Sequence, residues 1–154
     1  MAKAYLSLGS NIGNKRAHLI KAAALLAERV GDVLALSSLY ETAPWGFQAD
    51  NSFMNAALLL ETDCSPLELL EATSMIEVEM GRKAKSVDGQ YEDRIIDIDL
   101  LLYEDVVMQT ERLTLPHPLM HKRRFVLDPL VEIAPMAVHP IFHKTIYQLI
   151  EEYE

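Results

Sequence analysis

The sequence RIIDIDLLLY, residues 94–103, is an aliphatic run interrupted by two acids, Asp97 and Asp99. Its β-branched and aliphatic composition predicts a strand over residues 95–103. Because strand side chains alternate between two faces, both carboxylates are expected on one face. The opposite face is then expected to carry the apolar side chains Ile96, Ile98, Leu100 and Leu102.

Two carboxylates placed side by side on a strand repel each other, and burying them is costly unless a cation neutralises them. An oxygen-binding divalent cation satisfies both acids, and magnesium bound to a polyphosphate is the first candidate. The alternative is an edge strand whose second face is simply solvated, which is common for an isolated Asp-x-Asp pair. The remaining sequence is needed to choose between them.

On either side of this strand, the apolar periodicity predicts a regular succession of elements. Strands are expected around residues 4–8, 33–42 and 53–62, with a helix built on Leu19, Ala23, Leu26 and Val30 after the first of them. Gly9 and Gly13 are expected in the turn between that strand and helix. Ser65 and Glu68 form a capping-box signature that starts a second helix, ending at Gly81.

The predicted order is therefore β-α-β-β-α-β, which indicates an α+β fold of ferredoxin-like type. Two helices would cover one face of the antiparallel sheet and leave the other face available. Helices over residues 119–130 and 145–152 are expected to follow. A chain of 154 residues is long enough for one domain with one core, so we expect a single domain over residues 1–154.

The composition excludes several classes of partner. The net charge of −9 argues against nucleic acid and against an anionic membrane surface, since both call for a basic stripe. The basic residues concentrate between Arg82 and Arg124, which suits a small anion such as a nucleotide.

A single cysteine, Cys64, rules out an internal disulfide. With no secretion signal and no apolar membrane span in the sequence, we expect a cytoplasmic protein with no obligate protein partner.

On the strand at residues 53–62, Phe53 and Asn55 are expected on the same face. An aromatic plane beside a carboxamide suits a flat nitrogenous ring, which can stack on the first and hydrogen-bond the second. The simpler alternative is that Asn55 is a solvated residue at the strand flank.

Two further segments carry candidate phosphate contacts. Residues 82–94 contain several cations and could close over phosphates, although a solvated connection is the alternative. Residues 113–125 combine histidines and cations; the prolines at 116 and 118 argue against a zinc pair of His117 and His121, so phosphate contacts are favoured. His139 and His143 are expected at the surface.

Six motifs taken in order resemble the 6-hydroxymethyl-7,8-dihydropterin pyrophosphokinases of folate biosynthesis. They are AYLSLGSN (4–11), ETAPWG (41–46), FMNAA (53–57), GR (81–82), RIIDID (94–99) and LTLPHP (113–118). The resemblance spans nearly the whole chain and agrees with the ferredoxin-like order.

This resemblance implies transfer of the β,γ-diphosphate of ATP to the hydroxymethyl oxygen of the pterin, with release of AMP. It implies that Asp97 and Asp99 hold two magnesium ions and that Arg82 and Arg94 stabilise the developing charge. The positions that match ATP-binding residues are Glu77, Arg82, Arg94, Arg112, Thr114, His117 and Arg123. Those that match pterin-binding residues are Thr42, Pro44, Trp45, Phe53, Asn55 and Phe125.

The chain departs from the family pattern at a few positions. Phe53 and Tyr91 stand where tyrosine and tryptophan are common, and the stretch from Arg82 to Asp97 is longer than usual. Two other classes remain open: another two-metal phosphotransferase or nucleotidyltransferase, and a non-catalytic small-molecule-binding domain of the same fold.

Overall fold

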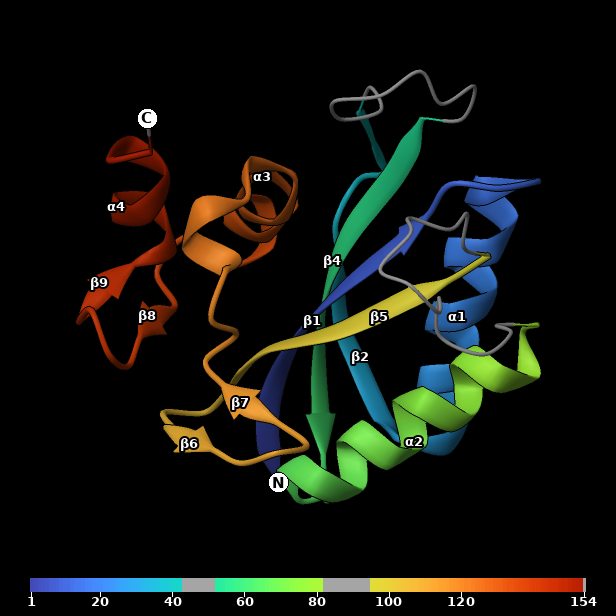
Figure 1. Cartoon of the computed structure of the whole chain (residues 1–154), viewed down its shortest axis with the longest axis horizontal. Coiled ribbons are helices and arrows are strands. Elements are labelled where there is room, and N and C mark those ends of the chain that lie inside the picture. Colours follow the sequence, from blue (N-terminus) through green and yellow to red (C-terminus); the bar gives the residue numbers. More distant parts are fainter. Residues whose placement is uncertain (43–51, 82–94, 154) are drawn as a thin grey trace.

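The computed structural model describes residues 1–42, 52–81 and 95–153. Its main sheet runs in the order β2-β4-β1-β5, with the short β3 paired to β4, and all of its pairings are antiparallel (Figure 1). The strands of this sheet are β1 (Ala2–Ser10), β2 (Gly31–Leu36), β3 (Tyr40–Thr42), β4 (Phe53–Thr62) and β5 (Asp97–Tyr103). The helices α1 (Lys15–Arg29) and α2 (Pro66–Glu79) complete the predicted β-α-β-β-α-β order. The α+β ferredoxin-like prediction is confirmed.

Two apolar layers hold the sheet between helices. One layer lies between the sheet and α1 and α2, and includes Leu6, Leu58 and Ile76. The other includes Leu101, Leu127 and Leu130, and lies against α3 (Arg124–Ile133). Figure 1 shows α1 and α2 on one side of the sheet and α3 with α4 (Ile146–Glu151) on the other. The second face of the sheet is thus only partly open, because α3 packs against β4 and the C-terminal half of β5.

The strand expected over residues 33–42 is divided into β2 and β3 by a break at residues 37–39. Its cause is the side chain of Ser37. That hydroxyl accepts a hydrogen bond from the Ala57 amide at 2.9 Å and donates to the Ser38 carbonyl at 2.8 Å. A serine hydroxyl that replaces a backbone partner competes with the regular ladder, and apolar periodicity does not report it.

A bulge in β5 places Leu102 on the face opposite to the one predicted for it. Tyr5 pairs with Leu102 while Leu6 pairs with Leu100, so Leu101 is an extra residue on β5. The alternation predicted for residues 96–100 is observed, but Leu102 joins Leu101 in the layer against α3. The bulge therefore places two consecutive leucines on the face that also carries Asp97 and Asp99.

The C-terminal third contains shorter elements than expected. The helix predicted over residues 119–130 is a 3-10 turn, η2 (Met120–Lys122), followed by α3, because Arg123 between them is extended (φ −121°, ψ 103°). Two small hairpins also occur here. The hairpin of β6 (Met108–Gln109) and β7 (Thr114–Leu115) lies between β5 and η2, and the hairpin of β8 (Val138–His139) and β9 (Lys144–Thr145) connects α3 to α4. Among the described residues, no helix combines the length and the apolar composition needed to cross a membrane.

The expectation that His139 lies at the surface is wrong. Its side chain is 2% exposed and stacks on Phe142, with 4.3 Å between ring centroids. The edge of His121 meets the same Phe142 ring at 4.8 Å. His139 Nδ1 accepts hydrogen bonds from the amides of Ile141 and Phe142. Burial, and secondly the charge of His121, lower the pKa of His139 to about 4.

This low pKa predicts an acid-sensitive C-terminal hairpin. A histidine in the unfolded chain has a pKa near 6.5. Between pH 6.5 and 4, the unfolded chain therefore binds a proton at His139 that the folded chain does not bind. The contribution of this group to stability is full above pH 6.5 and falls as the pH drops towards 4. We expect a loss of about 1–2 kcal/mol in unfolding free energy between pH 7.5 and 5 from this group. Urea titrations at both pH values check it: His139→Gln should remove most of that difference, whereas the exposed control His143→Asn should retain it. An equal pH dependence in both variants would contradict the assignment.

Candidate active site

The candidate site is organised by β1, which lies between β4 and β5. Gly9 of β1 is opposite Asn55 on β4 and opposite Asp97 on β5, and Ser7 is opposite Asp99. Directly opposed residues of antiparallel strands place their side chains on the same face. Asn55, Asp97 and Asp99 therefore share the face against which α3 packs. The sheet register brings the predicted amide and the predicted acid pair together.

The acid pair has the alternation that its sequence predicted. Asp97 and Asp99 are half-buried, and Ile98 between them is 5% exposed within the layer against α1 and α2. The two carboxylates thus project from one face of the strand, while Ile98 packs into the core on the other face. Their placement at the start of β5 is held by packing.

Glu77 fixes the backbone between the two aspartates. It lies on α2, is 6% exposed, and its Oε2 accepts a hydrogen bond of 2.7 Å from the Ile98 amide. Because β5 is the last strand of the sheet among the described residues, none of the strands they form lies beyond it to accept from this amide. A buried carboxylate on a helix does so instead, and couples α2 to the strand that carries the acids.

Removing this carboxylate should destabilise the fold. In Glu77→Ala the Ile98 amide is left buried without its acceptor, which costs about 1–3 kcal/mol. Urea unfolding measures the loss, and Glu71→Ala, an exposed acid on the same helix, provides a control that should stay close to the wild type. If Glu77→Ala unfolds at the wild-type urea concentration, the hydrogen bond does not have the structural role given to it here.

Asn55 is buried with unused hydrogen-bonding capacity. The residue is 5% exposed, and its Oδ1 has no hydrogen-bond partner within the described part of the chain. A buried acceptor without a partner is costly and is typical of a site completed by a ligand. A ligand N–H or O–H can satisfy it.

Gly9 makes room for this amide and does not lie in the predicted turn. It was expected in a turn, but it lies inside β1, where a Cβ would stand 3.0 Å from Asn55 Nδ2. A side chain at this position would require the Asn55 amide to shift by a few tenths of an ångström. The alternation along the strand predicts that Tyr5, Ser7 and Gly9 share one face. Only the strand register shows that Gly9 lies beside Asn55.

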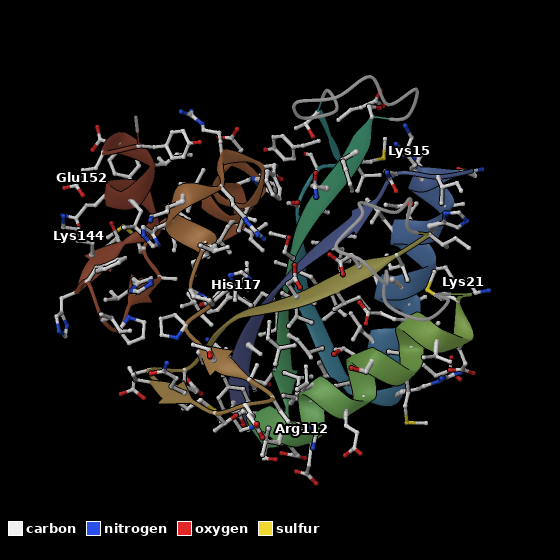
Figure 2. All side chains as sticks on the ribbon, viewed as in Figure 1. Lys15, Lys21, Arg112, His117, Lys144 and Glu152 are labelled. Carbon is white, nitrogen blue, oxygen red and sulfur yellow. The ribbon has the colours of Figure 1, made fainter. Side chains whose placement is uncertain are left out.

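His117 borders the same face through two hydrogen bonds. Its amide donates to the Leu101 carbonyl at 2.9 Å, and its ring Nδ1 accepts from the Leu119 amide at 3.1 Å. With Nδ1 as acceptor, the proton of the neutral ring is on Nε2. Burial lowers the pKa of His117, the charge of Arg123 lowers it further, and the charge of Asp97 opposes both. His117 is therefore a neutral N–H donor near neutral pH, and Figure 2 shows it beside β5 where the chain turns towards α3.

The aromatic candidates come from two different elements. Phe53 begins β4 opposite Thr42 of β3, while Phe125 lies in the first turn of α3 and is half-buried in the layer beneath it. The guanidinium carbon of Arg123 lies 5.7 Å from the centre of the Phe125 ring, which fixes a cation beside that aromatic face.

The remaining predicted residues lie apart or outside the described ranges. Thr114 is half-buried in β7, and Figure 2 shows Arg112 at the lower end of the view, away from the upper end at which β4 begins. Pro44, Trp45, Arg82 and Arg94 lie outside the described residues, as do Lys83, Lys85 and Tyr91.

The donor set fits a hard cation better than zinc. In the described ranges, no group of three His, Cys, Asp or Glu side chains could hold a metal. A pair of carboxylates without nitrogen or sulfur ligands suits magnesium, which keeps several waters and takes further oxygens from substrate phosphates.

Comparison with known proteins finds relatives that match most of the chain. A protein of Porphyromonas gingivalis described as 2-amino-4-hydroxy-6-hydroxymethyldihydropteridine pyrophosphokinase is 47% identical over 91% of this chain and 95% of its own length. A protein of Aquifex aeolicus with the same description is 42% identical over 94% of this chain and 88% of its own length. The folic acid synthesis protein fol1 of Schizosaccharomyces pombe is 42% identical over 97% of this chain, which corresponds to 20% of that protein.

The fold has a solved counterpart in a longer protein. The crystal structure of Plasmodium falciparum HPPK-DHPS with pteroate superposes with a TM-score of 0.77 at 18% identity, over 98% of this chain. The chain spans 42% of the length of that protein, so the likeness concerns the fold of one part of it.

The family model and the sequence relatives define an enzyme of the pyrophosphoryl-transferring class. Within this class, the chain belongs to the 7,8-dihydro-6-hydroxymethylpterin-pyrophosphokinase (HPPK) family, whose family model matches residues 5–135.

Proposed function

We propose that this enzyme transfers the β,γ-diphosphate of ATP to 6-hydroxymethyl-7,8-dihydropterin in folate biosynthesis. Asn55 binds the pterin, and the aspartate pair binds the magnesium-bound triphosphate. The pterin hydroxyl oxygen attacks the β-phosphorus, the bond from that phosphorus to the α-phosphate bridging oxygen breaks, and AMP leaves. The hydroxyl proton passes to solvent.

The observation that carries the proposal is the row Asn55–Gly9–Asp97. Strands in a sheet are about 4.8 Å apart, so the two side chains start roughly 10 Å from one another on one face. This span is comparable to a bicyclic pterin with its hydroxymethyl arm. A ring bound by Asn55 would thus present its hydroxyl towards the aspartates.

On this proposal, the pterin ring is held by hydrogen bonds and stacking. Asn55 and Thr42 bind its polar edge, and Phe53 and Phe125 stack on its two faces. Pro44 and Trp45 are proposed to line the same site from the segment between β3 and β4.

The triphosphate is proposed to lie along the aspartates. Two magnesium ions held by Asp97 and Asp99 would neutralise its charge. His117 donates Nε2–H to a phosphate oxygen, and Arg82, Arg94 and Arg123 add positive charge. Glu77, Arg112 and Thr114 are proposed on the nucleoside side. We further infer that the enzyme works in the cytoplasm as one domain over residues 1–154 and without an obligate protein partner.

Phosphorus NMR tests the proposal directly. The protein is incubated with ATP, magnesium and 6-hydroxymethyl-7,8-dihydropterin, with a control that lacks the pterin. Pterin-dependent AMP together with a new diphosphate ester is the expected result. ADP would identify an ordinary kinase, pyrophosphate release would identify a nucleotidyltransferase, and the absence of turnover in a folded sample would favour a binding domain.

A further inference from the structure

We propose that Glu132 is a positioning residue for the pterin: it clamps the strand β3 to the helix α3 and so fixes one side of the pterin site. The inference rests on the proposed function, because it assigns a task within that site. None of the sequence motifs pointed to Glu132.

Three donors converge on the Glu132 carboxylate. The hydroxyl of Tyr40 donates to Oε1 at 2.6 Å. The Ser38 amide donates to Oε2 at 2.9 Å and the Ser38 hydroxyl donates to the same oxygen at 3.2 Å. Hydrogen bonds to an ionised carboxylate are the strong ones, and several together hold one geometry.

The protonation states of both partners agree with a charged acceptor and a neutral donor. The hydrogen bond from Tyr40, then the bonds from Ser38, lower the pKa of Glu132. The hydrogen bond to Glu132, with burial and the charges of Glu132 and Asp128, raises the pKa of Tyr40 to about 12. The contact is therefore intact throughout the neutral range.

The location of the clamp connects it to the substrate side chains. Tyr40 is directly opposite Asn55, so its ring leaves β3 on the same face as that amide and reaches α3 at its hydroxyl end. On α3, Glu132 lies seven residues after Phe125, which is within about 20° of the same side of the helix. The clamp thus joins the strand that carries Thr42 to the helix that carries Phe125.

The rest of α3 is held independently of this clamp. Val126, Leu127 and Leu130 pack on Ala57 and the leucines of β5 in the layer described above. Loss of Glu132 should therefore leave the helix folded and release mainly β3 and its neighbours. Such a release would weaken binding of a ring between the two elements and leave the phosphate side unaffected.

Steady-state kinetics of Glu132→Ala and Tyr40→Phe test the inference. We expect the pterin KM to rise about fivefold in each variant, with the ATP KM within about twofold of wild type. The double variant should be no worse than Glu132→Ala alone, because Glu132→Ala already removes the acceptor of the Tyr40 hydroxyl. Glu132→Asp should recover part of the pterin affinity. The matched control is Glu152→Gln, which removes another exposed acid in an ion pair with Lys144.

A second readout separates this inference from the proposed function. Alkaline titration of tyrosine absorbance, wild type minus Tyr40→Phe, isolates Tyr40; its pKa should fall from about 12 towards 10 in Glu132→Ala. If wild type shows no pterin-dependent AMP, the proposed function fails whatever the titration gives. If wild type is active but the variants leave the pterin KM unchanged, or raise both KM values equally, the positioning role is overturned even where the Tyr40 pKa falls.

Discussion

Replacing Asp97 or Asp99 with asparagine should reduce kcat by at least about a thousandfold, since charge neutralisation at a polyphosphate contributes several kcal/mol to the barrier. Asparagine keeps the shape and removes the charge, so circular dichroism and urea unfolding should stay close to wild type. Coupled detection of AMP measures the rate. Calorimetric titration of magnesium with a non-hydrolysable ATP analogue should show weaker binding.

Asp105→Asn provides the matched control for these variants, because Asp105 is exposed in the turn after β5. It should turn over at the wild-type rate. If magnesium-dependent nucleotide binding survives both Asp97→Asn and Asp99→Asn, the acid pair is an incidental solvated face and the catalytic assignment is wrong.

The second large effect is expected at Asn55. Asn55→Ala should raise the pterin KM by about 10–100-fold, which corresponds to the loss of one or two ligand hydrogen bonds. The ATP KM should change little. Folding should be nearly unaffected, since Oδ1 has no partner within the described residues. Initial rates over a range of pterin concentrations measure the effect.

Two further variants sharpen this prediction. Asn55→Asp keeps an acceptor and loses the donors, so its pterin KM should differ from that of Asn55→Ala. The difference would show whether the polar edge of the pterin depends on the acceptor or on the donors of Asn55. Gln109→Ala, an exposed amide on β6, should leave both KM values unchanged. An unchanged pterin KM in Asn55→Ala would remove this residue from the site.

The order of elements was predictable because each long segment obeys one hydrophobic period. The capping box of Ser65 and Glu68 is confirmed, with hydrogen bonds of 3.2 and 2.9 Å. The pairing of Asp97 and Asp99 on one face followed from the same rule. Local patterns of this kind depend on neighbouring residues only.

What sequence reasoning missed depends on contacts between distant segments. The break at Ser37 needs the Ala57 amide, and the bulge at Leu101 needs the register with β1. His139 has no local sign of burial, since Phe142 and His121 are brought to it by the hairpin and η2. The row from Asn55 through Gly9 to Asp97 likewise requires the strand order.

The hydrogen bond from Ile98 to Glu77 also bears on how the family can vary. It ties the helix before residues 82–94 to the strand after them, so the two attachment points of that segment are set independently of its length. Closing a loop costs only about 0.6 kcal/mol for each doubling of its length. Residues inserted or removed there should therefore leave the aspartates in place and change the stability of the protein little.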